Sequence, residues 1–166
     1  MAQHFLEKCQ IIPAFMPVNI ASGNNNGDWV NMKNFDRCAI VFVGAAGAAS
    51  QDPTITVLQA TSDGGSSKAL NFTRVDRKQA TALTSVAAFT TVTQADGNTY
   101  TNDTLAELQK LVVIDISVDD MDVANGYDWL QANIADVGST SQLGVMLYVL
   151  HDPKYVTNGV TPGAIA

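Results

Sequence analysis

The chain is dominated by short segments with the residue pattern of β-strands, separated by turn residues at regular intervals. In the clearest of them Val112, Ile114 and Ile116 alternate with more polar positions, which is typical of a half-buried strand. Residues 38–43 are continuously apolar and predict a strand that is buried on both faces. The predicted strands are 29–35, 37–43, 54–61, 68–75, 86–93, 111–118, 127–135 and 142–150.

Turn signals separate these strands and favour antiparallel pairing. Asp63-Gly64-Gly65 predicts a hairpin turn, and residues 21–28 and 44–52 are loops rich in small and polar residues. The only helical signal is a capping box at 104–107, which predicts one helical turn over 105–110. We therefore predict an all-β fold, a sandwich of about eight antiparallel strands with a jelly-roll-like arrangement.

Both termini are predicted to be extended arms around this sandwich. The expected organisation is an N-terminal arm and loop at 1–27, a sandwich at 28–150 and a C-terminal tail at 151–166. Pro13 and Pro17 exclude a continuous helix in the first segment. Its apolar residues need a cover, either a partner or the chain's own sandwich, against which the segment would fold back as an edge strand. The candidate interface residues are Phe5, Ile11, Ile12, Phe15, Met16 and Trp29.

Composition bears on the kind of partner. Charged residues make up only 15% of the chain and the formal net charge is −7, so that a surface for nucleic acid, which needs clustered cations, is not expected. The one basic cluster, Arg74, Arg77 and Lys78, is interrupted by Asp76. Residues 1–10 do not have the pattern of a signal peptide, and no apolar run has the length of a membrane span, so neither is expected. We expect a protein made in a reducing cytoplasm, with no membrane partner.

No residue pattern predicts catalysis, a cofactor or a metal site. The two histidines, His4 and His151, lie near opposite ends of the chain, and neither a nucleophile elbow nor a phosphate-binding glycine loop occurs. Two cysteines, Cys9 and Cys38, make no metal-ligand pattern, although a disulfide between them stays open. The protein is expected not to be an enzyme.

Two further groups of residues have competing interpretations. The acidic stretch around 119–122 is favoured as a solvated turn over a structural cation site, and no EF-hand spacing is present. The strand aromatics are favoured as core or subunit contacts over a ligand platform. They are Trp29, Tyr127, Trp129 and Tyr148.

Several segments resemble a known group of proteins. Residues 55–70 read Ile-Thr-Val-Leu-Gln-Ala-Thr-Ser-Asp-Gly-Gly-Ser-Ser-Lys-Ala-Leu, and 89–95 read Phe-Thr-Thr-Val-Thr-Gln-Ala. Asp119-Asp120-Met121-Asp122 and residues 142–148, Gln-Leu-Gly-Val-Met-Leu-Tyr, follow. Over about residues 10–155 the sequence resembles small virion proteins of tailed bacteriophages. Within this group it is most similar to head decoration (cement) proteins.

The resemblance implies a function and partners. A decoration protein binds the exterior of the capsid, bridges neighbouring subunits of the major capsid protein and stabilises the shell. It also implies a homo-oligomer, a dimer or trimer, held in the virion. The alternatives are a tail or head–tail connector protein, or a carbohydrate-binding β-sandwich in which Trp29 or Trp129 is the sugar platform.

Overall fold

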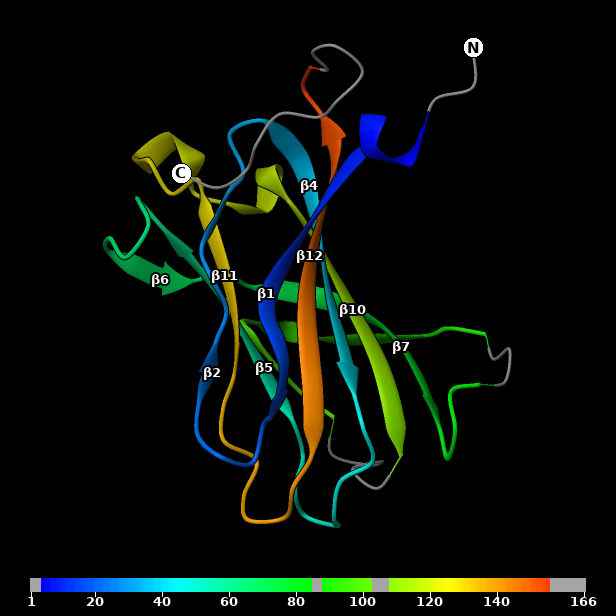
Figure 1. The fold of residues 1–166 in the computed structure, drawn as a ribbon. Helices are drawn as coiled ribbons and strands as arrows, with labels where there is room; N and C mark the ends of the chain where they lie inside the picture. The colour runs from blue at the N-terminus through cyan, green and yellow to red at the C-terminus, as the bar shows by residue number, and fades with distance from the viewer. Residues whose placement is uncertain (1–3, 85–87, 103–107, 156–166) are drawn as a thin grey trace.

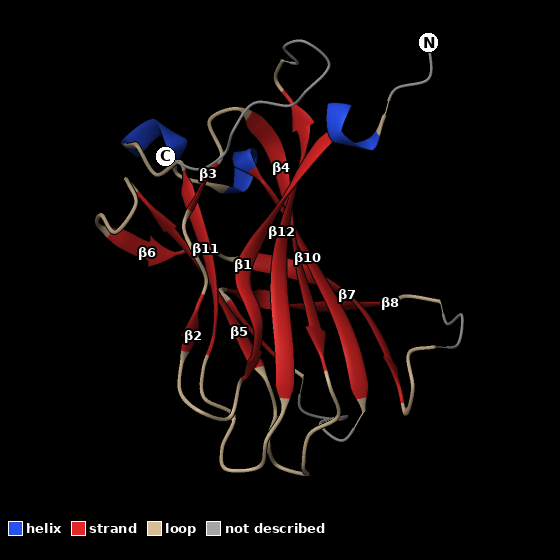
Figure 2. Ribbon diagram, in the orientation of Figure 1, coloured by secondary structure: helices blue, strands red, loops and turns tan. Residues whose placement is uncertain are grey.

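The structure is a computed structural model that describes residues 4–84, 88–102 and 108–155. Strands form nearly all of its regular structure, and the three short 3₁₀ turns lie toward one end of the molecule (Figure 2). The strands are β1 (Cys9–Asn19), β2 (Asn25–Asn26), β3 (Val30–Asn31), β4 (Phe35–Gly44), β5 (Thr54–Ala60), β6 (Ser67–Ala69), β7 (Phe72–Ala80), β8 (Thr90–Gly97), β9 (Thr99–Thr101), β10 (Gln109–Ser117), β11 (Trp129–Ile134) and β12 (Leu143–Pro153). The 3₁₀ turns are η1 (Phe5–Glu7), η2 (Val118–Asp120) and η3 (Val123–Asn125).

The strands form two antiparallel sheets. The first sheet has the order β1-β12-β4-β10-β7-β8. In the second sheet the order is β2-β11-β5-β6, with β3 also on β11 and β9 also on β5. From β1 to β12 the chain passes repeatedly from one sheet to the other, as in a jelly roll. The predicted all-β sandwich is therefore confirmed, with twelve strands in the described part of the chain because several are only two or three residues long.

The core lies between the two sheets and follows the alternation read from the sequence. Val112, Ile114 and Ile116 of β10 are buried, as are Ile40 and Phe42 of the neighbouring β4. Because side chains point to opposite faces along a strand, each strand gives every second residue to the core. The second sheet contributes Ile55, Val57, Leu130, Ala132 and Ile134.

The predicted N-terminal arm is wrong for residues 9–19. They form β1, an edge strand paired with β12 from Cys9 opposite His151 to Asn19 opposite Leu143. The first and last strands are therefore neighbours, seen in Figure 1 as blue beside orange. Pro13 and Pro17 are accommodated because an edge strand has one side without ladder hydrogen bonds, and two register shifts occur in this region. Folding back over the chain's own sandwich was the alternative to the arm, and it is confirmed here.

Three other expectations change. The predicted strand 29–35 is interrupted: β3 has two residues, and a turn at Lys33 and Asn34 precedes β4. At the other terminus β12 continues to Pro153, and Lys154 donates its backbone N–H to Asn34 O at 3.0 Å. The predicted helical turn over 105–110 is wrong at its end, because Gln109 and Lys110 are the first residues of β10. Its residues 105–107 lie outside the described residues, as do the rest of the predicted tail, 156–166, and the start of the predicted strand 86–93.

Candidate assembly interface

The outer face of the first sheet, the side turned away from the core, is apolar over four adjacent strands. Its members come from β1, β12, β4 and β10 and stand in three cross-strand rows. The rows are Ile11–Val149–Ala39–Asp115, Pro13–Leu147–Val41–Val113 and Val145–Val43–Leu111. Only Asp115, at one corner, is charged. We call these side chains, without Asp115, the apolar outer face.

This face is open to solvent in the isolated chain. Ile11 is 45% exposed and Val43 is also exposed, while Val41 and Leu147 are half-buried. The continuous apolar run 38–43 predicts burial on both faces, but in the described part of the chain the second sheet covers only one of them. The exposed side of these strands therefore has the composition of a surface that another molecule covers.

The outer face of the second sheet has a different composition. Its positions carry Thr54, Thr56 and Leu58 on β5 and Gln131 and Asn133 on β11, so that one apolar side chain stands among four polar ones. Gln131 donates from Nε2 to the backbone oxygen of Gly27 at 2.7 Å, so part of this polar surface is used within the fold. Since both sheets need only one apolar face to build the core, the apolar character of the first sheet's outer side is not required by folding.

The apolar outer face is large enough to matter for association. Four strands about 4.8 Å apart and five residues of about 3.3 Å each give a footprint of about 320 Å². The largest apolar patch on a typical monomer is about 300–600 Å² and is often functional. A standard interface buries about 800 Å² on each partner, with an apolar centre and a polar rim. The footprint fits the centre of such an interface.

A polar rim borders the face at the row beyond Asp115. Arg37 donates from its guanidinium to Asp115 Oδ2, with the shorter contact at 2.6 Å, and this hydrogen bond raises the pKa of Arg37. His151 lies with Nε2 3.2 Å from Asp115 Oδ1 and Nδ1 3.2 Å from Asp152 Oδ2. Arg37 and His151 are directly opposite each other on β4 and β12. The positive charge of Arg37 and the negative charge of Asp115 compensate each other in this rim.

Beyond β10, on the side away from β1, the apolar outer face borders a groove over β7 and β8. A hollow of about 370 Å³ is lined by Arg74, Asp76, Phe89, Thr91 and Val113. Val113 belongs to the apolar outer face, whereas Thr91 belongs to β8, the last strand of the sheet. Arg74 Nε donates to Asp76 Oδ2 at 3.0 Å, and this bond lowers the pKa of Asp76. The outer face of the sheet thus changes from apolar at Val113 to charged and polar over β7 and β8.

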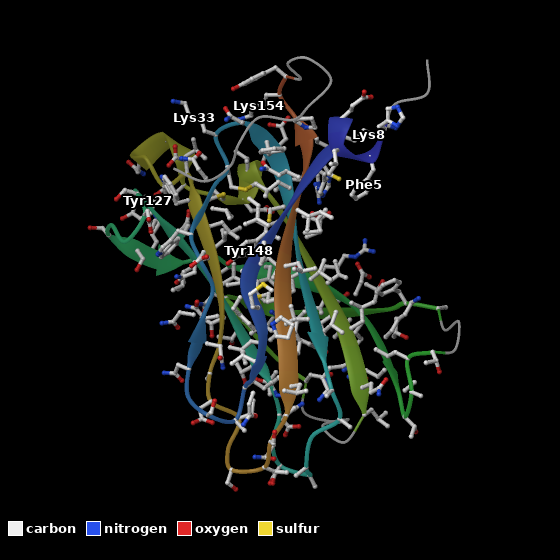
Figure 3. The ribbon with its side chains drawn as sticks, in the orientation of Figure 1. Phe5, Lys8, Lys33, Tyr127, Tyr148 and Lys154 are labelled. Carbon is white, nitrogen blue, oxygen red and sulfur yellow. The ribbon has the colours of Figure 1, made fainter. Side chains whose placement is uncertain are left out.

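The predicted interface residues separate into exposed and buried ones. Phe5 is 61% exposed and Met16 is 68% exposed, and Ile11 belongs to the apolar outer face. Ile12 instead points into the core, and Phe15 packs partly against it. Trp29 is half-buried next to β3. Figure 3 shows Phe5 near the N-terminal end of β1, away from the middle of the sheet.

Sequence reasoning missed most of the apolar outer face. Val41, Val43, Leu147 and Val149 lie in runs that the sequence marks as apolar on both sides. The continuous apolar run 38–43 is the signal for part of this face, but it predicts a strand buried on both faces inside the sandwich. Only the position of the second sheet reveals which side of these strands is left open.

The acidic stretch is occupied by contacts within the chain. Asp122 forms an ion pair with Lys68 and accepts from Asn125 Nδ2 at 2.8 Å, and the bond with Lys68 lowers the pKa of its carboxyl. Asp120 Oδ2 accepts from the backbone N–H of Ser117 at 3.2 Å. In the described residues no group of three or more His, Cys, Asp or Glu side chains has an arrangement that could hold a metal ion.

The cysteines and aromatics are mainly parts of the packing. Neither Cys9 nor Cys38 is in a disulfide, and burial raises the pKa of both thiols. Trp129 is only 8% exposed, so it offers no open ring face for a sugar. Tyr127 is half-buried, and the Lys68 ammonium lies 4.1 Å from the centre of its ring. Among the described residues no helix has the length and apolarity needed to cross a bilayer.

Comparison with known proteins adds no assignment: no family model matches the chain, and no curated protein matches it either.

Proposed function

We propose that this chain is a structural virion protein of a tailed bacteriophage that decorates and stabilises the capsid. The observation that carries the proposal is the apolar outer face, a second hydrophobic surface on a sheet whose other side already forms a full core. Such a surface supports a role in which the protein acts by binding a partner protein through this face. The resemblance of the sequence to head decoration proteins supplies the partner, the major capsid protein, and a site on the exterior of the virion.

The fold is compatible with this role without assigning it. Jelly rolls occur in viral capsid proteins, and also in lectins and enzymes, so the fold alone carries no function. The mechanism is linkage: a protein that binds only the assembled shell stabilises that shell by mass action. Several copies bound to one shell add avidity. In this mechanism the apolar outer face meets capsid subunits and the rim around Arg37 and Asp115 sets the orientation.

The test is binding of the purified chain to isolated capsids after a change at the centre of the face. Val41→Asp places a carboxylate in the middle row, while Thr56→Asp is the matched control at the centre of the second sheet's outer face. Because a carboxylate that is buried without a partner costs several kcal/mol, we expect Val41→Asp to weaken binding at least about 30-fold. The control is expected to bind within about threefold of wild type.

Urea unfolding of both variants separates lost binding from lost folding. Equal binding by wild type and a folded Val41→Asp variant would show that the face is not the contact. The number of copies per virion, measured by quantitative mass spectrometry, tests the location. Hundreds of copies per virion agree with a place in the shell, and tens favour the tail or neck instead. If virions contain no copies, a virion role is overturned.

A further inference from the structure

Lys110 is a fully buried lysine on the inner face of the first sheet. It alternates along β10 with exposed and half-buried residues and lies on the same side as Val112 and Ile114, so its side chain points between the two sheets. Fully buried lysines are rare in folded proteins, and a desolvated lysine amine is a recurrent nucleophile. The proposed capsid contact does not use it, because that contact is on the opposite face of the sheet.

The side-chain carbonyl of Asn102, the residue after β9, is polarised by three donors. Its Oδ1 accepts from Arg77 Nη1 at 3.1 Å and from the Tyr100 hydroxyl at 3.4 Å, and Gln79 Nε2 donates to it as well. Donors gathered on one carbonyl oxygen stabilise the negative charge that the oxygen gains when a nucleophile adds to its carbon. The Asn102 amide is therefore activated toward attack.

The amide nitrogen of the same side chain is not held in this way. Asn102 is only 2% exposed, and its Nδ2 has no hydrogen-bond partner among the described residues. A buried polar atom without a partner costs free energy and needs an explanation. A polarised carbonyl with an unheld nitrogen has the arrangement of an acyl donor whose leaving group is that nitrogen.

Lys110 is separated from this amide by one side chain. Gln79, which donates to Asn102, is directly opposite Lys110 on β7 and shares its face of the sheet. Residues directly opposite in an antiparallel pair have Cα atoms about 4.5–5.5 Å apart. The five bonds from Cα to Nζ, about 1.5 Å each, span about 6 Å in an extended lysine. The amine of Lys110 can therefore reach the carbon whose oxygen Gln79 holds.

We propose that the side chains of Lys110 and Asn102 join in an intramolecular isopeptide bond. Nζ of Lys110, as the neutral amine, adds to Cγ of Asn102; the Nζ–Cγ bond forms and the Cγ–Nδ2 bond breaks. Nζ loses one proton and the leaving nitrogen gains one, so that one molecule of ammonia departs and no oxidant or other reactant is consumed. Desolvation favours the neutral, nucleophilic form of a buried amine.

Asp52 is the carboxyl that we assign to the proton transfer. It precedes Pro53, whose backbone oxygen accepts from the N–H of Asn102 at 3.2 Å. Its Oδ1 is buried and has no hydrogen-bond partner in the described part of the chain. A positioned carboxyl takes a proton from the attacking nitrogen and returns it to the leaving one, as a general acid–base catalyst does. Asp52 therefore sets the rate, whereas Lys110 and Asn102 form the bond.

The isopeptide bond ties one sheet to the other. Asn102 follows β9, which pairs with β5 in the second sheet, and Lys110 is near the start of β10 in the first. A covalent link between two segments restricts the unfolded chain and so stabilises the fold. The proposal stands apart from the shell role, because the bond lies inside the sandwich.

The test is the intact mass of the purified full chain, denatured and measured by high-resolution mass spectrometry. Wild type is expected to be lighter than its sequence by one molecule of ammonia, and fragment spectra are expected to link Asn102 to Lys110. Lys110→Met is expected to have the full mass of its sequence. The matched control is Lys78→Met, on the outer face of the same sheet opposite Leu111, which is expected to lose ammonia as wild type does.

A wild-type chain that keeps the full mass of its sequence after prolonged incubation overturns the proposal. Loss of ammonia that persists in Lys110→Met overturns it as well, because the ammonia would then come from a reaction without this amine. Asp52→Asn is expected to slow the loss at least about tenfold, and an unchanged rate would refute Asp52 as the proton carrier. The measurement involves no capsid, so its failure leaves the proposed function standing.

Discussion

Tyr148 makes a hydrogen bond across the core that holds the two sheets together, and its removal has a calculable cost. The residue is on β12 of the first sheet, is fully buried, and lies in the middle of the molecule (Figure 3). Its hydroxyl accepts from the backbone N–H of Ala132 on β11, in the second sheet, at 2.8 Å. Gly27, between β2 and β3, donates its backbone N–H to Ala132 O at 3.1 Å.

Tyr148→Phe keeps the ring and removes the acceptor, leaving the Ala132 N–H buried without it. An unsatisfied buried donor costs about 1–3 kcal/mol. We expect a loss of about 2 kcal/mol in the free energy of unfolding, which for a domain of this size lowers Tm by about 4–8 °C. Urea unfolding followed by tryptophan fluorescence measures it as a lower midpoint with an unchanged slope.

The matched control is Tyr155→Phe. The Tyr155 hydroxyl donates to Asn34 Oδ1 at 3.3 Å, but this residue is exposed. Its loss is expected to change stability by less than about 0.5 kcal/mol. If Tyr148→Phe is as stable as this control, the Ala132 N–H does not need the hydroxyl and the reasoning about the cross-sheet bond is refuted.

Two further predictions concern the same core. Gly27→Ala is expected to destabilise the fold by about 1–3 kcal/mol, since a Cβ there would lie 2.5 Å from Ala132 O and 2.6 Å from the Tyr148 hydroxyl; a wild-type Tm would contradict this. Burial, and to a smaller extent Asp115, raises the pKa of the Cys38 thiol, so the folded chain keeps a proton that the unfolded chain loses above about pH 8.5. Stability is therefore complete below that pH and falls as pH rises, by up to about 1.4 kcal/mol per pH unit for this group. Cys38→Ala should flatten the slope measured by urea unfolding between pH 9 and 10, and an unchanged slope would count against the assignment.

Local pattern was sufficient to predict most strands. The alternation in 111–118 and the β-branched run in 54–61 correspond to β10 and β5, and the turn at Asp63-Gly64-Gly65 does join β5 to β6. The predicted strand 68–75 after this turn is wrong as one strand, because it is divided between β6 in the second sheet and β7 in the first. These features depend on residues a few positions apart, because the side-chain period of a strand and the conformations of a turn are local properties. The all-β class and the sandwich follow from them.

The position of β1 and the open face depended on contacts between distant residues. Pro13 and Pro17 exclude a helix but are equally compatible with an arm and with an edge strand; pairing with β12, more than 100 residues away, decides between them. A continuous apolar run such as 38–43 states that both sides of a strand avoid water, but not what covers each side. The second sheet covers one side, and the apolar outer face is what remains, because a sheet has two faces and the residues that the structure describes supply a cover for only one.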